Sequence, residues 1–238
     1  MTERVHIDQG HEDDLRCLRV QVIMMGGRVE TLVGASVRAL TQRDAELARR
    51  TVESHCAVDQ HEIAIDSLCR RILARRCPAL SDLRFVTSSL RLATDLERIA
   101  DLGGSISRCV LDLCAEAPLQ PEVGLPRMAT EVESMLHEAL DAFVASDPSR
   151  AKEVIARDQL VDNLSVQIFC ELLTHVAQNT RCMTQALRLQ SAAKYLERIG
   201  DHVTYLGEMV VLMVRGEDVR HAANSGDCMR AVANHERN

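Results

Sequence analysis

Two acidic pairs occupy the same positions of a repeated motif, and their residue type and spacing are those of metal ligands. Glu97 and Asp101 belong to the segment L-E-R-I-A-D, and Glu197 and Asp201 belong to L-E-R-I-G-D, one hundred residues later. On a helix, side chains four residues apart lie one above the other, so the two carboxylates repel each other unless a cation binds between them. The repeated spacing therefore indicates either a cation-binding function or a solvated acidic helix face.

A second acidic pair precedes each motif, again with a spacing of four residues. Glu62 and Asp66 precede the first motif, and Asp158 and Asp162 precede the second. Each of these pairs lies on the flank of its helix, where the helix meets its neighbour at the bundle surface. Four carboxylates from two adjacent helices would then converge on one shallow site. All-oxygen ligands favour hard ions such as Mg²⁺, Ca²⁺, Mn²⁺ or Fe³⁺ over a tetrahedral structural zinc.

The apolar pattern around the first motif predicts which way its acids point. At 100° per residue, a buried stripe forms within about 60° of Ile99. The stripe consists of Leu92, Leu96, Gly103, Ile106 and Val110. Glu97 and Asp101 fall on the opposite side, and the second motif repeats this arrangement. We therefore expect an exposed acidic surface rather than a buried catalytic dyad.

The composition favours an all-α protein. The 238 residues are 46% hydrophobic and 26% charged, with three Phe, two Tyr, no Trp and five Pro. Sandwiches and barrels need more aromatic and β-branched residues and more frequent turns. Proline is excluded from helix interiors, so the prolines divide the chain into six expected helices. The first three helices are expected over residues 8–40, 44–77 and 81–117. The fourth runs from the linker to residue 146, the fifth begins at residue 147, and the sixth ends near residue 215.

The repeated motif indicates an internal duplication into two tandem three-helix bundles. An offset of 100 residues aligns the two motifs. Under this offset Asp66 matches Val166 and Asp158 matches Val58, so the two sites are expected to differ. The predicted organisation is a first three-helix repeat (1–117), a linker (118–126), a second three-helix repeat (127–215) and a polar C-terminal tail (216–238).

Charge and cysteine content narrow the class of protein further. The formal net charge is −7 and no basic tract is present, which argues against nucleic acid as a partner. Nine cysteines without a C-x-x-C pair are typical of free thiols in a reducing compartment. No signal peptide is evident, and no apolar run is long enough to span a bilayer. We expect a cytoplasmic protein that is not an integral membrane protein.

The order and spacing of these motifs resemble the PhoU family of phosphate-transport regulators over nearly the whole chain. The similar segments are E-I-A-I-D (62–66), R-R-I-L-A-R-R-C-P-A-L-S-D-L-R (70–84), D-L-E-R-I-A-D (95–101), D-Q-L-V-D (158–162), Y-L-E-R-I-G-D (195–201) and V-R-G-E-D-V-R-H (214–221). The resemblance implies two similar three-helix bundles, frequent dimers, and multinuclear iron or zinc clusters at E(D)-x-x-x-D motifs. It also implies a negative regulator of the phosphate-starvation response, acting between the ATPase subunit of the phosphate ABC transporter and a membrane sensor histidine kinase.

Carried onto this chain, the resemblance implies eight metal ligands, four in each half. They are Glu62, Asp66, Glu97, Asp101, Asp158, Asp162, Glu197 and Asp201. Manganese and magnesium stay open beside iron and zinc. His61 is a candidate auxiliary ligand, although a solvated histidine is the preferred interpretation. His202 follows Asp201 directly, but adjacent helical residues point about 100° apart, so it is not expected to bind the same ion.

Two other classes of protein compete with a metal-binding regulator. A ferritin-like enzyme or storage bundle would need E-x-x-H motifs on two helices, and the single match is Glu3-x-x-His6. A metal-free structural adaptor would use the acids for solubility alone. The sequence contains no nucleophile–base pair, glycine-rich phosphate loop or Walker motif, so we expect no enzymatic activity.

Overall fold

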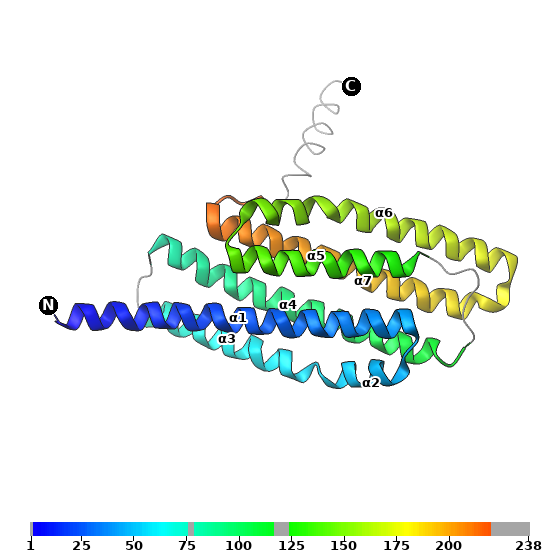
Figure 1. The fold of residues 1–238 in the computed structure, drawn as a ribbon, viewed down its shortest axis with the longest axis horizontal. Coiled ribbons are helices and arrows are strands. Elements are labelled where there is room, and N and C mark those ends of the chain that lie inside the picture. Colours follow the sequence, from blue (N-terminus) through cyan, green and yellow to red (C-terminus); the bar gives the residue numbers. More distant parts are fainter. Residues whose placement is uncertain (1, 76–78, 117–123, 220–238) are drawn as a thin grey trace, which may run out of the picture.

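The protein is an elongated bundle of antiparallel helices (Figure 1). The computed structural model describes residues 2–75, 79–116 and 124–219, and these ranges contain helices but no strand. The elements are α1 (Thr2–Gln42), α2 (Ala45–Glu53), α3 (Cys56–Arg75), α4 (Leu80–Leu113), α5 (Leu125–Ala145), α6 (Pro148–Gln178), the 3₁₀ turn η1 (Thr180–Cys182) and α7 (Met183–Arg215). Across these residues, none of the helices has the apolar length that crossing a bilayer requires.

The helices form two three-helix units, which confirms the predicted all-α duplicated fold. Helices α1, α3 and α4 pack on one another in the first half, with the short α2 against α1 and α4. Helices α5, α6 and α7 form the second half in the same way. The halves lie side by side along their length, joined mainly by α4 against α7 and also by α1 against α5 (Figure 1).

The same turn follows the first helix of each half. Arg43 and Ser146 both adopt the left-handed conformation, with φ of 55° and 52°, and thereby end α1 and α5. The next residue is the N-cap of the following helix. The Asp44 carboxylate accepts hydrogen bonds from two backbone N–H groups of α2, and Asp147 does the same at the start of α6. The chain therefore reverses direction by the same local chemistry in both halves.

The buried positions reveal how the duplicated helices correspond. Val58, Ile65 and Leu68 of α3 are buried, and the buried residues of α6 lie 96 positions later, at Val154, Val161 and Leu164. The third helices correspond at 100 residues, as Leu96 and Ile99 do with Leu196 and Ile199. The first helices correspond at 103, since the N-caps Asp44 and Asp147 differ by that number. A single offset of 100 was therefore wrong for the second helix of each half.

This correspondence removes the asymmetry expected from the sequence. At an offset of 96, Glu62 matches Asp158 and Asp66 matches Asp162. Val58 and Val166 are consequently not the counterparts of acids. Both halves hold a complete pair of acids on the second helix, and any difference between the two sites must come from other residues.

The helix expected over 44–77 is interrupted. Helix α2 ends at Glu53, and α3 begins at Cys56. The Ser54 hydroxyl donates a hydrogen bond to the Thr51 carbonyl at 2.8 Å, a contact that competes with the helical hydrogen-bond ladder and bends the chain. The two residues of the turn, Ser54 and His55, therefore leave the helical path, and His55 is directed towards α4.

The remaining boundaries differ modestly from those expected. Helix α1 is longer than 8–40, α4 ends four residues before 117, and the last helix ends at Arg215 as predicted. Helix α5 already begins at Leu125, so the last two residues of the predicted linker are helical. Residues 118–123 of that linker and the tail from 220 onward lie outside the described residues.

One close helix contact positions the middle of α4. A Cβ atom at Gly103 would lie 2.7 Å from a methyl group of Leu32, so α4 and α1 approach each other closely there. The Ser36 hydroxyl donates a hydrogen bond to the Gly103 carbonyl at 2.9 Å. Helix α4 is thereby fixed against α1, with its motif residues turned towards α3.

Candidate metal centres

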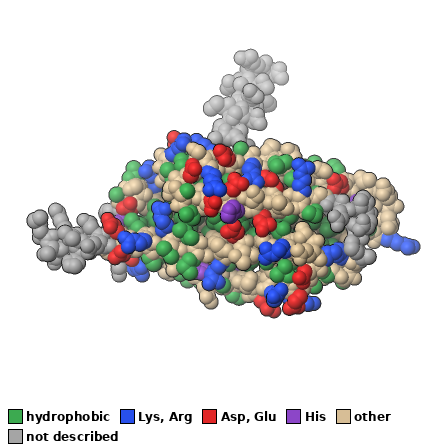
Figure 2. Space-filling view, viewed as in Figure 1, with side chains coloured by type: hydrophobic (Ala, Val, Ile, Leu, Met, Phe, Trp, Pro, Cys, Tyr) green, Lys and Arg blue, Asp and Glu red, His purple; other side chains and the backbone are tan. Residues whose placement is uncertain are grey.

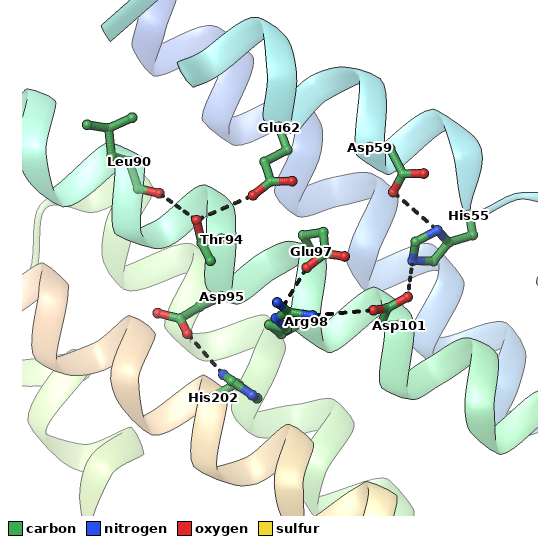
Figure 3. A network of polar contacts seen from close by, with 10 residues as sticks. All are labelled: His55, Asp59, Glu62, Leu90, Thr94, Asp95, Glu97, Arg98, Asp101 and His202. Carbon is green, nitrogen blue, oxygen red and sulfur yellow. Dashed lines mark hydrogen bonds and ion pairs between the residues drawn. The ribbon is translucent and has the colours of Figure 1, made fainter. Parts of the chain in front are cut away.

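The first acidic cluster lies between α3 and α4 (Figure 3). Glu62 points from α3 towards α4, where its carboxylate accepts a hydrogen bond from the Thr94 hydroxyl at 3.3 Å. Glu97 and Asp101 point from α4 back towards α3. The side chain of Glu97 is only 17% exposed, whereas that of Asp101 is 48% exposed. The structure thus places the acids of the first motif between α3 and α4.

This placement corrects the prediction that the motif acids face away from their own bundle. Ile99 and Leu96 are fully buried, as the helical wheel predicted. The wheel describes one helix alone, however, and the neighbouring α3 covers part of the side opposite Ile99. Glu97 is consequently half-buried rather than exposed.

His55 completes the first cluster, and the sequence analysis missed it. Its Nδ1 lies 3.2 Å from Asp59 Oδ1, and its Nε2 lies 3.0 Å from Asp101 Oδ1 without hydrogen-bond alignment. Among the residues that the structure describes, His55, Glu97 and Asp101 form the group whose ligand atoms lie within 4.8 Å of one another. The helical pattern gave no sign of it, because His55 reaches α4 only through the break between α2 and α3, which the sequence analysis did not predict.

The first cluster fits a cation by the chemistry of its donors. Burial raises the pKa of Glu97, and the nearby negative charges of Asp101 and Glu62 raise it further, while Arg98 and His55 oppose the rise. A bound cation would relieve this repulsion. One imidazole nitrogen together with carboxylate oxygens is a donor set that suits iron, zinc or manganese.

The second acidic cluster lies between α6 and α7. Burial raises the pKa of Asp158, and the negative charges of Asp162, Asp201 and Glu197 add to the rise. The pKa of Asp201 is also raised, first by burial and then by Glu197 and Asp162. The charges of these acids therefore influence one another, although within the described residues the ligand atoms of this half do not gather within 4.8 Å as those of His55, Glu97 and Asp101 do. Their oxygens form a set that suits a hard cation.

A lysine already occupies part of this second cluster. Lys194 Nζ lies 2.6 Å from Glu197 Oε1, and the Ser165 hydroxyl donates to Glu197 Oε2 at 2.7 Å. Although burial opposes the change, these two hydrogen bonds lower the pKa of Glu197. The ammonium group neutralises one carboxylate of the set and would compete with a metal ion for it.

Two of the sequence-predicted residues lie outside the clusters. Asp66 forms an ion pair with Arg70 on the same helix, and this arginine neutralises it locally. The His61 ring lies 3.2 Å from the Gln21 side chain of α1 and makes no contact with the acids.

Arg98 of the motif lies 3.6 Å from Glu97 and 3.7 Å from Asp101, so it balances part of their charge.

A further ion pair connects the halves near both clusters. His202 Nδ1 of α7 lies 2.9 Å from Asp95 Oδ1 of α4, and the two side chains are 18% and 19% exposed (Figure 3). Tyr205 packs edge-on against the His202 ring. His202 therefore serves the contact between the halves rather than the second cluster.

Fold and sites together define a class of protein: a duplicated three-helix bundle with an acidic cluster between the second and third helices of each half. The model of the PhoU domain matches residues 22–110 and, a second time, residues 125–210. The chain belongs to the PhoU domain family.

Several relatives match almost the whole chain. The phosphate-specific transport system accessory protein PhoU homolog of Pseudomonas aeruginosa is 38% identical over 91% of this chain and 90% of its own length. The phosphate-specific transport system accessory protein PhoU of Escherichia coli is 33% identical over the same shares.

Two solved structures have the same fold. The crystal structure of PhoU from Pseudomonas aeruginosa matches with a TM-score of 0.83 at 37% identity, over 87% of this chain and 99% of that one. The phosphate transport system regulatory protein PhoU from Streptococcus pneumoniae matches with a TM-score of 0.81 at 27% identity, over 88% and 99%. The likeness covers both halves of the molecule.

Proposed function

We propose that this chain is an accessory protein of a phosphate-specific transport system and a negative regulator of phosphate uptake and of the phosphate-starvation response. The observation that carries the proposal is the similarity to phosphate-transport accessory proteins over about nine-tenths of both chains. The two complete PhoU domains support it, because they correspond to the whole architecture of such a protein.

The regulator acts by docking rather than by catalysis. Its partners are the ATPase subunit of the phosphate transporter and a sensor histidine kinase, both at the cytoplasmic side of the membrane, and it works as a homodimer. The surface supports docking to proteins: in the view of Figure 2, acidic and basic side chains are mixed over the visible face, with no single-sign basic area suited to nucleic acid.

Metal ions bind at the two acidic clusters and modify the docking surface. In the first half the ligands are Glu62, Glu97, Asp101 and His55, and in the second half they are acids of α6 and α7. A bound cation neutralises the repelling carboxylates and changes the electrostatic potential of that face, which favours or disfavours a charged partner. The ion is iron, zinc or manganese in the first half, according to its donor set.

The direct test of the metal is elemental analysis of chain purified without a histidine tag or chelator. The comparison is a variant in which Ala replaces Glu97, Asp101, Glu197 and Asp201. Its metal content and its binding to the transporter ATPase are both measured. We expect stoichiometric metal in the parent chain and none in the variant, with altered binding to the transporter ATPase. Unchanged metal content and unchanged binding in the variant would contradict the metal part of the proposal.

The regulatory role is tested in cells that lack their own family member. Expression of this chain is expected to repress a phosphate-starvation reporter in phosphate-rich medium. A reporter that stays fully active, with the chain present at normal levels and folded, would overturn the proposed function. The metal variant in the same cells then separates repression from metal binding.

A further inference from the structure

A histidine of α5 connects the two halves of the molecule. His137 Nδ1 lies 2.6 Å from Glu30 Oε1 of α1, and its Nε2 lies 3.7 Å from Asp141 Oδ2, one turn further along α5. The Asp141 carboxylate also pairs with Arg150 of α6 at 3.1 Å. One imidazole therefore lies between a carboxylate of the first half and a carboxylate of the second.

Both ring nitrogens of His137 face an acid, so protonation decides how many acids the ring can serve. A protonated imidazole has two N–H donors and a positive charge that attracts both carboxylates. A neutral imidazole has one N–H, and its other nitrogen turns a lone pair towards the second carboxylate, which repels it. The link across the halves is therefore strong in the protonated form and weakened in the neutral form.

The charged groups that act on His137 come from three helices. Glu30 of α1 raises the pKa of His137, first through its hydrogen bond and then through its charge, and Asp141 of α5 adds to the rise. Desolvation and the Arg150 guanidinium of α6 oppose the rise. The acids prevail, and the ring keeps its proton to a higher pH than an isolated histidine does.

The duplication supplies an internal comparison within the same helix contact. At the correspondence of 103 residues for the first helices, each of these residues of α1 and α5 has a counterpart on the opposite helix. The matched residues are Glu30 and Glu133, His137 and Gly34, and Asp141 and Arg38. A Cβ atom at Gly34 would lie 2.8 Å from Glu133 Oε1 and 3.6 Å from the Arg38 guanidinium. An acid therefore crosses between α1 and α5 a second time, now beside an arginine.

The two crossings respond to pH in different ways. Arg38 keeps its charge at any pH at which proteins are normally folded, because the arginine guanidinium does not lose its proton there. His137 loses its charge in the range around neutral pH. The contact between α1 and α5 therefore contains one crossing with a permanent positive charge and one whose positive charge depends on pH.

We propose that His137 is a pH-sensitive clamp between the two halves, closed while its imidazolium lies between Glu30 and Asp141 and loosened when the ring loses its proton. Because the folded state binds this proton more tightly than the unfolded chain does, the stabilisation is fully present below the ordinary histidine pKa. It is lost as pH rises through the raised pKa of His137. The loosening is confined to α1 and α5, since α4 against α7 also joins the halves. None of the three residues belongs to an acidic cluster, so the clamp is independent of metal binding and of the phosphate role.

An NMR titration of the purified full chain measures the protonation of His137 directly. Its imidazole signals are assigned by their loss in His137→Gln. We expect the pKa of His137 to lie above that of a histidine in the urea-unfolded chain, and to fall in Glu30→Gln, which keeps the shape of the side chain but removes the charge. A parent pKa at or below the unfolded value would overturn the clamp. An unchanged pKa in Glu30→Gln would overturn it too, because the link would then not cross between the halves.

Urea denaturation at pH 6 and pH 9 measures what the link contributes to folding. At pH 6 the folding equilibrium constant of the parent should exceed that of His137→Gln by about two- to fivefold, the scale of a solvent-exposed ion pair, and the ratio should fall towards one at pH 9. The matched control is Arg38→Gln at the second crossing, whose effect should be the same at both pH values because arginine does not titrate between them. A ratio for His137→Gln that does not change with pH would contradict the proposal.

Amide hydrogen exchange locates the loosening. After correction for the intrinsic exchange rates, the amides of α1 around Glu30 and of α5 around His137 should exchange about two- to fivefold faster at pH 9 than at pH 6, relative to those of α3. His137→Gln should remove this difference. Faster exchange spread evenly over all helices would mean that the proton acts on overall stability, and the clamp between the halves would be rejected. Because these tests use the purified chain alone, failure of the clamp is distinct from failure of the phosphate role.

Discussion

The two halves of the molecule build the same acidic framework and then balance its charge in different ways. In the first half, His55 faces Glu97 and Asp101, and the position matching Lys194 is Thr94, which donates to Glu62. In the second half, Lys194 neutralises Glu197, and the position matching His55 is Ala151. The first cluster therefore has an additional candidate ligand, whereas in the second cluster a lysine pairs at 2.6 Å with one of the acids.

Packing explains why the histidine occurs in one half only. A Cβ atom at Gly207 of α7 would lie 3.1 Å from the Ala151 carbonyl, so α6 and α7 approach closely there. An imidazole at position 151 does not fit between them. In the first half, the break after α2 moves the chain off the helical path and gives His55 room to reach α4. The difference teaches that local backbone geometry, rather than the acidic motif, decides which half brings a histidine to its acids.

The largest expected effect comes from His55→Ala, which introduces into the first half the alanine that the second half has at the matching position 151. Loss of one ligand should weaken metal binding at the first cluster by at least the roughly 10- to 100-fold that loss of a residue supporting a ligand typically costs. Calorimetric titration with Zn²⁺ or Mn²⁺ measures it, in a background where Glu197→Ala and Asp201→Ala remove the second cluster.

The control for this substitution is His61→Ala, which removes another partly buried histidine, on the adjoining helix α3. His61 contacts Gln21 and lies apart from the acids, so its loss should leave the affinity unchanged. Equal losses in the two variants would show that His55 acts only through the stability of α3.

The converse exchange, Lys194→Thr, should strengthen the second site. The substitution removes a cation that competes with a metal ion for Glu197. Burial alone would raise the pKa of Glu197, but the hydrogen bonds from Lys194 and Ser165 lower it. We expect about tenfold tighter binding of a divalent ion at the second cluster, the scale of one neighbouring charge partly screened by solvent. Titration of a chain that carries Glu97→Ala and Asp101→Ala isolates this site, and an affinity that stays the same or falls would contradict the competition.

The sequence predicted the fold well because the helical periodicity and the prolines are local signals. The stripe around Ile99 is buried as expected, and the duplication is confirmed. The correspondence of the second helices was misjudged because a shift of one turn keeps a similar apolar pattern. Burial resolves it, since Val58 and Val154 are both inside.

The site was less predictable, because it depends on what lies opposite each acid. His55 faces Glu97 because the chain breaks between α2 and α3, and the helical spacing of apolar residues does not reveal that break. The partner of Asp66 was also hidden, although Arg70 lies only four residues away, because many helical acids have such neighbours and most remain solvated.

The contact between the halves provides a smaller test of their independence. His202→Leu introduces the residue that the first half has at position 102, and it leaves the largely buried Asp95 without its ion-pair partner. We expect a loss of about 1–3 kcal/mol in the free energy of unfolding, measured by urea denaturation at neutral pH. The double variant with Asp95→Asn should recover part of it, whereas a double variant no better than the single one would show that packing of the ring against Tyr205 carries the effect.

The smallest expected effect separates repulsion from metal binding at the second cluster. Burial and the charges of Asp162 and Asp201 raise the pKa of Asp158, so the folded state holds this proton more tightly than the unfolded state does. Ionisation of Asp158 therefore costs the folded state stability as pH rises from the usual aspartate range through the raised pKa, and the cost persists above it. In metal-free protein at pH 7, Asp158→Asn should raise Tm by at most about 2–4 °C, because solvent screening of this partly exposed carboxyl limits the gain to about 1 kcal/mol or less. The gain should vanish below the usual aspartate pKa, where the carboxyl is protonated in both states.

With saturating metal the sign should reverse, because the amide is a weaker ligand than the carboxylate. Scanning calorimetry over pH, with and without metal, measures both signs. A variant that is less stable than the parent in metal-free protein at pH 7 would mean that Asp158 is held by favourable contacts rather than strained by its neighbours.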